Sequence, residues 1–178
     1  MTRPVVTYDE LRQLVDGYEG LADEHGLLVR ADIADLQINV RVVDATPMRG
    51  QIMVETALQV QSQDESVVPL VGGRAHHPGL GVCRTADLLV VAEDILDRQP
   101  DDFAVLGPSA AAAVEVSADG ESDALRTYRR LGVPVYAHVD PRCGTLTVHS
   151  ASSRRTYKFG DAVQLGPWTI DTSKFPAR

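Results

Sequence analysis

Two acidic residues lie beside apolar segments of the chain and could carry chemistry. Asp87 directly precedes the apolar run 88–91, and Glu115 lies inside the apolar run 110–116. Burying an unpaired charge in such a run costs free energy. Glu115 therefore needs a strand end that faces solvent, an arginine partner or a metal ion. The positions of both residues predict that a sheet presents them.

The histidines and serines give weaker signals. Adjacent His76 and His77 could ligate a metal ion, but their loop contains glycine and proline, which favours exposed positions instead. His138 lies in an apolar segment near Asp140, which favours a structural role. Ser117 lacks the sequence context of a nucleophile elbow, so we expect no hydrolase triad.

Apolar periodicity predicts the elements that position these residues. Thr7 and Glu10 have the spacing of a capping box, which begins a first helix that Gly26 ends. Residues 36–42 alternate between apolar and polar, as a strand with one solvent-facing side does. We then expect a turn over 44–50. The expected elements after it are a helix over 51–63, a strand over 67–71 and a loop over 72–81.

The second half of the chain gives stronger signals. The continuous apolar runs 88–91 and 110–116 suit strands that are buried on both faces. A short helix between 119 and 131 and a strand over 135–139 follow, and this order predicts a crossover unit. Two more short strands are expected near 146–148 and 157–159. Together these elements predict an α/β or α+β fold, in which helices flank a mixed central sheet.

Composition predicts one globular domain over residues 1–178. The chain has 178 residues, of which 44% are hydrophobic and 24% charged, and this suits a single packed core. No apolar run is long enough to span a membrane, and the first residues lack the apolar stretch of a signal peptide. We therefore expect a soluble, cytoplasmic protein. Cys83 and Cys143 are then expected to be reduced and buried.

The charge distribution limits binding to nucleic acid. The net charge of −8 argues against tight nonspecific binding to DNA, because phosphate contacts need clustered Lys and Arg. Only two of the 17 basic residues are lysines, Lys158 and Lys174. Arg129–Arg130 and Arg154–Arg155 could form a basic patch. Surface ion pairs with the many acidic residues are the favoured alternative.

Several segments in the second half together resemble a known family. The matching segments are Ala86–Val91, Ala113–Val116, Tyr128–Pro141 and Phe159–Leu165. In this order they are similar to the "PD plus apolar strand", "VEV", "GVp.YW.vDp" and "GD.v.l" motifs of the Uma-two family of predicted restriction endonucleases. That family is a branch of the PD-(D/E)xK nuclease superfamily. The resemblance runs from about Asp87 to the C-terminus and implies a restriction-endonuclease-like core.

The resemblance also implies a metal-dependent phosphodiesterase that acts on DNA. Asp87 and Glu115 would stand on adjacent strands and bind Mg²⁺, or alternatively Mn²⁺, because these ions prefer oxygen ligands. The metal ion would lower the pKa of a bound water and stabilise charge on the scissile phosphate. A lysine nearby would orient the attacking water or neutralise developing charge.

The chain departs from the family's pattern at that lysine. The segment 116–123 is shortened, and the position that corresponds to the lysine is Ala124. Arg126, Arg129 or Arg130 could replace it as the cation, and Arg126 is the residue we assign. An arginine is a planar fork rather than a compact donor, so the replacement is not equivalent.

Two more positions depart from the pattern. The family's "ELIDG" strand is missing, since Leu36–Asn39 occupies roughly its place, and Ala137 replaces the tryptophan of the "YW" pair. These changes indicate a degenerate active site. One hypothesis is a magnesium-dependent DNA endonuclease that uses Asp87, Glu115 and Arg126. Another is a catalytically inactive pseudo-nuclease that binds nucleic acid or another protein, and a third is a homodimeric scaffold without a nucleic-acid role.

Overall fold

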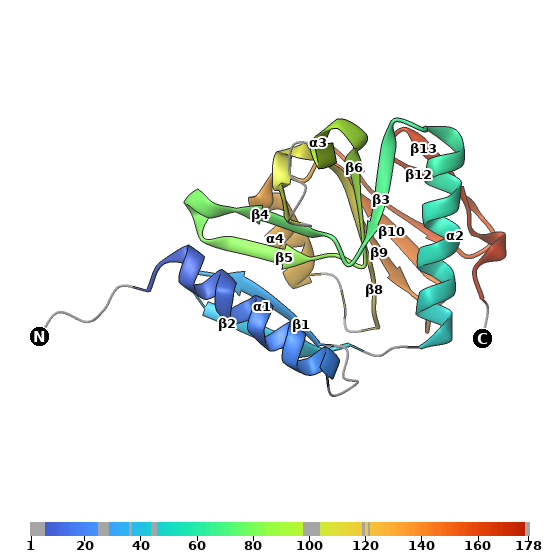
Figure 1. Cartoon of the computed structure of the whole chain (residues 1–178). Coiled ribbons are helices and arrows are strands. Elements are labelled where there is room, and N and C mark those ends of the chain that lie inside the picture. The colour runs from blue at the N-terminus through green and yellow to red at the C-terminus, as the bar shows by residue number, and fades with distance from the viewer. Residues whose placement is uncertain are drawn as a thin grey trace, which may run out of the picture.

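The computed structural model describes residues 6–24, 29–35, 37–43, 46–97, 104–118, 120 and 122–176. In this part of the chain, the strands form two large sheets and a hairpin, and helices lie beside them (Figure 1). The helices are α1 (Tyr8–Glu24), α2 (Pro47–Gln63), α3 (Glu93–Asp97) and α4 (Ser122–Leu131). None of the described helices is long and apolar enough to cross a membrane. The mixed α+β architecture with helices beside mixed sheets confirms the predicted fold class.

The first sheet has the strand order β2-β1-β5-β4-β7. Its strands are β1 (Val29–Ala34), β2 (Gln37–Val42), β4 (Arg74–His77), β5 (Val82–Thr85) and β7 (Ala104–Leu106). Helix α1 covers one face, where Leu11 and Val15 pack against Ala31, Ile33 and Cys83. Successive side chains of a strand point to opposite faces. The residues next to Ala31 and Ile33 therefore point away from α1.

The second sheet has the strand order β11-β10-β9-β8-β6-β3. Its strands are β3 (Val67–Val71), β6 (Leu88–Ala92), β8 (Ala110–Val116), β9 (Tyr136–Asp140), β10 (Thr145–His149) and β11 (Arg154–Lys158). Strands β8 and β9 are parallel and α4 lies between them in the chain, which confirms the predicted crossover unit. Strands β6 and β8 are antiparallel neighbours, with Leu88 opposite Val114.

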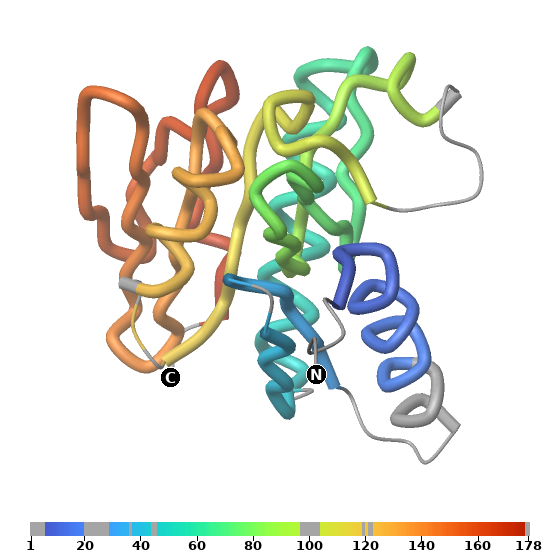
Figure 2. The backbone as a smooth tube through the Cα atoms, turned by 90° about the vertical axis from the view of Figure 1, so that its left-hand side faces the viewer, coloured from blue at the N-terminus to red at the C-terminus, as the bar shows by residue number. Residues whose placement is uncertain are grey.

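The second sheet is covered on both faces. On one face, α2 packs with the hairpin of β12 (Ala162–Leu165) and β13 (Trp168–Asp171). On the other face, Tyr128 and Leu131 of α4 pack against Leu89 and Ala113. This double covering explains why β6 and β8 are continuous apolar runs. In Figure 2 the C-terminal strands, coloured orange to red, lie on one side of the molecule and α1, in blue, lies on the other.

The predicted start of the first helix is confirmed. The backbone N–H of Thr7 donates to Glu10 Oε2 at 2.8 Å, and the N–H of Glu10 donates to Thr7 Oγ1 at 3.3 Å. This reciprocal pair is a capping box. The predicted stop at Gly26 lies outside the described residues.

Two predictions of local structure are wrong, and a buried strand was missed. The helix α2 begins at Pro47 and not at residue 51, because Thr46 caps it and proline suits the first helical position. The expected loop 72–81 contains β4, whose short length hides the period-two pattern. The buried strand β1 was not predicted. The predicted strand over 36–42 is β2, whose apolar residues Val40 and Val42 are exposed.

The two cysteines differ in their surroundings. Both are free thiols, as expected. Cys83 is buried beneath α1, but Cys143 is exposed in the turn between β9 and β10, so the prediction that both are buried is wrong.

Candidate functional site

Asp87 stands at the start of β6, next to the end of β8. Its backbone N–H donates to the Val114 carbonyl at 3.1 Å, which continues the pairing of the two strands. Its side chain is almost fully buried, and Oδ2 accepts the backbone N–H of Val116 at 2.6 Å. The strand pair therefore holds this carboxylate in a fixed position.

Two arginines bind the other oxygen of Asp87. Arg30 comes from β1, on the face away from α1, and Arg49 comes from the first turn of α2; both donate to Oδ1. The cap of α2 fixes Arg49, since its backbone N–H donates to Thr46 Oγ1 at 3.3 Å. Asp87 and Arg30 are at most 9% exposed at their side chains, so this is a buried ion pair.

Glu115 on β8 is bound by a second set of donors. Arg84 of β5 donates from Nε to Oε1 at 2.7 Å and from Nη2 to Oε2 at 3.0 Å. The hydroxyl of Tyr128 donates to Oε1 at 3.0 Å, and Arg41 Nη1 of β2 lies 3.9 Å from Oε2. The bidentate geometry is the strong form of an Arg–carboxylate pair. The apolar strand thus accommodates Glu115 through arginine, one of the three solutions that its sequence position left open.

Burial and the charge of Glu115 shift the pKa values of Arg84 and Tyr128. Burial lowers the pKa of Arg84, but the hydrogen bonds and charge of Glu115 outweigh it, so the pKa lies above its ordinary value. Burial raises the pKa of Tyr128 well above its ordinary value, and the charge of Glu115 raises it further. Both groups therefore stay protonated and keep donating to Glu115.

A third carboxylate, Asp32 of β1, joins the set around Glu115. Its Oδ1 accepts the backbone N–H of Thr85 at 2.9 Å, and its Oδ2 lies 2.9 Å from Arg41 Nη2 and 3.5 Å from Arg84 Nη1. Burial raises the pKa of Asp32 above its ordinary value, although the charges of both arginines lower it. Sequence analysis missed Asp32 because it missed β1. The alternation of Ala31 and Ile33 with charged neighbours was the available signal.

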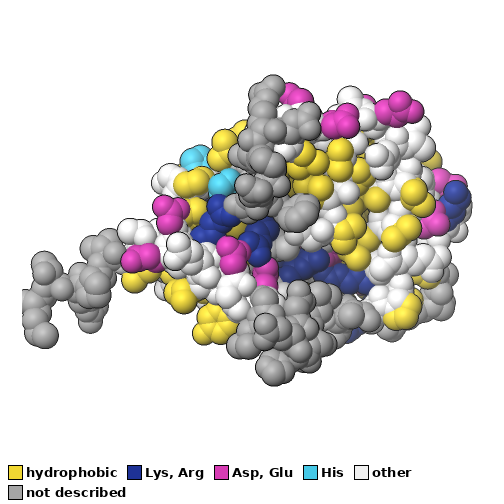
Figure 3. Space-filling view, viewed as in Figure 1, with side chains coloured by type: hydrophobic (Ala, Val, Ile, Leu, Met, Phe, Trp, Pro, Cys, Tyr) yellow, Lys and Arg dark blue, Asp and Glu magenta, His cyan; other side chains and the backbone are white. Residues whose placement is uncertain are grey.

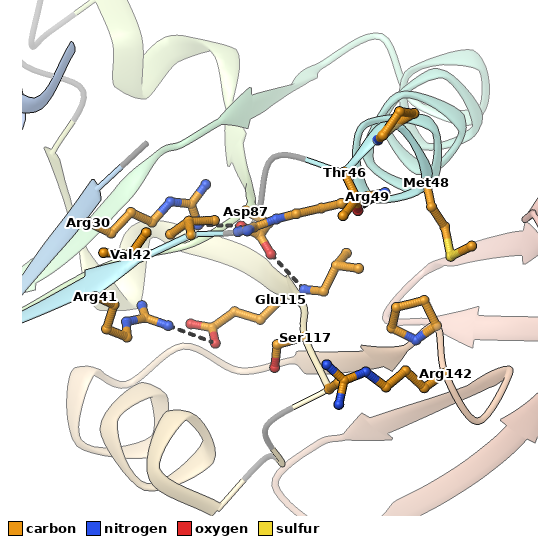
Figure 4. A pocket seen from close by; sticks show the side chains of 15 residues that line it. Arg30, Arg41, Val42, Thr46, Met48, Arg49, Asp87, Glu115, Ser117 and Arg142 are labelled. Carbon is orange, nitrogen blue, oxygen red and sulfur yellow. Dashed lines mark hydrogen bonds and ion pairs between the residues drawn. The ribbon is translucent and has the colours of Figure 1, made fainter. Parts of the chain in front are cut away.

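The arginines and carboxylates line one pocket of about 630 Å³ (Figure 4). It lies between β1 and β2, the N-terminus of α2, the end of β8 and the turn after β9. Among the described residues, its charged lining consists of Arg30, Arg41, Arg49, Arg142, Asp87 and Glu115. Four cations and two anions make the pocket positive in a chain of net charge −8. Figure 3, which views the molecule from the same side as Figure 1, shows Lys and Arg side chains gathered across the middle of the surface.

The arginine that was assigned from the sequence lies elsewhere. Arg126 is exposed on α4 and pairs with Asp123 at 2.8 Å, and it is not among the residues that line the pocket. Arg84 contacts Glu115 in its place. Sequence comparison could not find Arg84, because β5 precedes Asp87 and lies far from the expected lysine position.

The carboxylate oxygens of the pocket are not arranged to bind a divalent cation, because other groups already occupy them. Asp87 uses both oxygens, for a backbone N–H and for two guanidinium groups, and Glu115 uses both oxygens for Arg84 and Tyr128. A metal ion would have to displace arginines whose charge repels it. No group of three or more His, Cys, Asp or Glu that could hold a metal ion occurs among the described residues.

The histidines lie in two different surroundings. His76 is buried on β4, where Nδ1 lies 3.3 Å from the hydroxyl of Tyr8, so the expectation of an exposed pair is wrong for this residue. Burial lowers the pKa of His76, and the charge of Arg12 lowers it further. His138 is buried on β9, and its Nε2 lies 3.2 Å from Ser117 Oγ, which lines the pocket.

Comparison with known proteins gives one informative result. No family model matches the chain, and no curated protein matches it. A solved structure from Anabaena variabilis ATCC 29413, described as a "putative nuclease belonging to DUF820", covers 90% of this chain with a TM-score of 0.69. The match covers 89% of that protein at 11% sequence identity. DUF820 is the Uma-two family, so the likeness supports the nuclease-like fold that the sequence motifs imply.

Proposed function

We propose that this chain is a nuclease-like protein that binds the phosphodiester backbone of nucleic acid in the arginine-lined pocket. The observation that carries this function is the concentration of cations in one place. Arg30, Arg41, Arg49 and Arg142 line a single pocket, although the chain as a whole is acidic. The nuclease-like fold supports nucleic acid as the source of the phosphate.

The geometry suits an oxyanion. A guanidinium group presents a planar fork of donors that matches the oxygens of a phosphate. Arg142 is exposed at the mouth of the pocket, and no acidic side chain among the described residues pairs with it. Asp87 and Glu115 orient the deeper arginines before any ligand arrives, and such preorganisation reduces the entropy lost on binding.

The same distribution favours a single strand or a strand end over a long duplex. Tight duplex binding relies on phosphate contacts spread along an extended basic surface. The described pocket offers cations for only a few phosphates, and acidic residues outnumber basic ones over the chain by 25 to 17. We therefore expect weak binding, with a dissociation constant near the micromolar range.

Fluorescence anisotropy tests the proposal with a labelled 12-nucleotide single strand and the matching duplex. Arg142→Ala removes an exposed cation of the pocket, so it should weaken binding of the single strand about tenfold, the size of one charge-assisted hydrogen bond. Arg155→Ala is the matched control, because Arg155 is exposed on β11 and does not line this pocket. Equal binding by all three proteins would contradict the proposal.

Metal-dependent hydrolysis of DNA is the second candidate. It is favoured because Asp87 and Glu115 come from adjacent strands and line one pocket, as the family resemblance implies. It requires the arginines to leave the carboxylates first. Calorimetry with Mg²⁺ and Mn²⁺ decides between the candidates: heat that is present in the wild type and absent in Asp87→Ala supports the second. No heat at millimolar metal leaves the first.

A further inference from the structure

Ser117 and His138 form a hydrogen-bonded pair at the edge of the pocket. Ser117 Oγ lies 3.2 Å from His138 Nε2. Ser117 lines the pocket, and Figure 4 shows it between Glu115 and Arg142. The separation is within reach of proton transfer between a nucleophile and its base.

The fold explains why these two residues meet. Ser117 follows the last residue of β8, and its backbone N–H donates to the Val139 carbonyl of β9 at 3.0 Å. The strands are parallel, with Glu115 opposite His138. Ser117 and His138 therefore lie at the carboxyl ends of adjacent parallel strands, the place where α/β sheets commonly form ligand sites.

The turn that follows β9 holds a carboxylate close in sequence to His138. Asp140 lies two residues further on β9, and its Oδ1 accepts the backbone N–H groups of Arg142 at 2.8 Å and Cys143 at 3.1 Å. Burial raises the pKa of Asp140, but the hydrogen bonds from Cys143 and Arg142 and the charge of His138 lower it below its ordinary value. The same turn carries Arg142 to the mouth of the pocket.

We propose that Ser117 is the nucleophile of a metal-independent phosphoryl transfer and that His138 is its base. The inference rests on the proposed binding of a phosphodiester in this pocket. It assigns chemistry to a pair that is separate from the carboxylates, which the arginines already occupy. The pair also differs from a nucleophile elbow, since Ser117 ends a strand rather than standing on a strand-to-helix turn, and sequence context therefore could not reveal it.

The transfer takes place in two displacements. The Ser117 hydroxyl gives its proton to His138 Nε2 while a bond forms from Oγ to phosphorus and the bond to the leaving alcohol breaks. The leaving oxygen takes the proton from the imidazolium. A water molecule then attacks phosphorus, His138 accepts a proton from it, the bond to Ser117 Oγ breaks, and the serine oxygen recovers a proton.

The arginines provide the electrostatic part of this reaction. Charge develops on the oxygens around phosphorus as Oγ attacks, and fixed cations stabilise such charge most where water is scarce. Arg142 and Arg41 line the same pocket as Ser117. The buried carboxylates hold the deeper arginines in place, so the cations need little reorganisation during the reaction.

The experiment uses the full chain and bis(p-nitrophenyl) phosphate, an activated phosphodiester, in the presence of EDTA. Release of p-nitrophenolate is followed by absorbance, and the modified peptide is identified by mass spectrometry. The wild type should release nitrophenolate and gain one p-nitrophenyl phosphoryl group on Ser117. Ser117→Ala should give no adduct. His138→Gln can still hydrogen-bond to Ser117 but should react at least 100-fold more slowly, the usual contribution of a general base.

Ser153→Ala is the matched control, since Ser153 is an exposed serine that does not line this pocket, and it should react like the wild type. Anisotropy with the labelled single strand is run on every variant. Wild-type protein that binds the strand but forms no adduct overturns this inference and leaves the proposed function standing. An adduct on Ser117 that forms equally fast in His138→Gln also overturns it. If the wild type does not bind the labelled single-stranded nucleic acid, the proposed function itself is overturned.

Discussion

Each buried carboxylate of the pocket is matched by arginines rather than by lysine. Arginine keeps its charge when buried, and its fork can bind two oxygens at once. This explains how Asp87, Glu115 and Asp32 can all be buried, since arginine charges neutralise them. The preference for arginine in the composition is consistent with this use.

Asp87→Asn is expected to destabilise the fold strongly. The change removes the carboxylate charge that Arg30 and Arg49 share, and their side chains are only 9% and 12% exposed. Breaking a buried pair by removing one partner costs about 3–5 kcal/mol. Urea denaturation measures the free energy of unfolding. Asp35→Asn is the control, because its pair with Arg130 is exposed and is worth about 1 kcal/mol or less.

An Asp87→Asn variant that is not destabilised would indicate a different role for the carboxylates of the pocket. Carboxylates gathered to hold a metal ion repel each other when the metal is absent, so neutralising one of them should then stabilise the protein. An Asp87→Asn variant that is as stable as the wild type would therefore contradict the arginine pairing described above.

Asp32 is expected to make stability fall as pH rises. Burial raises its pKa in the folded state above the ordinary value of 3.8, so the folded state binds more protons than the unfolded state above about pH 4. The contribution is fully present below the unfolded pKa and is lost as pH rises through the folded pKa. The free energy of unfolding of the wild type, relative to Asp32→Asn, should decline as pH rises above about 4. A difference that stays constant or rises would refute the assignment.

At the scale of elements, the beginning of α2 determines the position of Arg49. Thr46 caps the helix and accepts the backbone N–H of Arg49, while Pro47 occupies the first helical position. Both Thr46 and Arg49 line the pocket. The cap therefore serves the helix and the site together.

Thr46→Ala is expected to cost about 1 kcal/mol of folding stability, the usual contribution of an N-cap hydroxyl. It should also weaken binding of the labelled single strand, because the backbone of Arg49 loses its anchor. Thr46→Ser keeps the hydroxyl and should restore both quantities. Chemical denaturation and anisotropy provide the two readouts, and an Ala variant that matches the Ser variant in both would rule out a capping role.

Elements differ in how far their local sequence predicts them. The runs 88–91 and 110–116 are apolar throughout because both faces of their sheet are covered, so β6 and β8 were predicted. Strand β4 has only four residues, and its neighbours in the sheet supply its pairing. Strand β1 alternates apolar and charged residues over only six positions, and its charged face is buried rather than solvent-facing, which its local sequence does not reveal.

At the scale of the whole molecule, the charge is divided between an acidic surface and a positive pocket. The chain has a net charge of −8, but arginines predominate where β1, β2, α2 and β8 meet. A ligand with one or a few phosphates can use the pocket, whereas a long duplex would also approach acidic side chains. The proposed function therefore predicts selectivity for short or single-stranded ligands.

Binding should therefore depend only modestly on salt. Single-stranded binding loses about 0.7 logarithmic units of affinity per neutralised phosphate for each tenfold rise in salt. Two or three phosphates in the pocket predict a slope between about −1.4 and −2.1, and Arg142→Ala should reduce its magnitude by about 0.7. Anisotropy at several salt concentrations gives the slope. A much steeper dependence, unchanged in Arg142→Ala, would locate the contacts elsewhere.

The sequence by itself determined the elements with strong local patterns and the two acidic residues beside them. The capping box of α1, the buried strands β6 and β8 and the crossover through α4 follow from periodicity, and Asp87 and Glu115 are found from their positions at those strands. These features depend on neighbours within a few residues. For that reason one sequence was enough to predict them.

Only the tertiary structure decided what those carboxylates bind. The arginines come from four different elements, and each precedes the carboxylate that it contacts by 31 to 74 residues: Arg30, Arg41, Arg49 and Arg84. Asp32 lies on a strand that was not predicted. Sheet pairing and packing bring them together, and neither leaves a local pattern. The same is true of Ser117 and His138, which meet only because β8 and β9 are parallel neighbours.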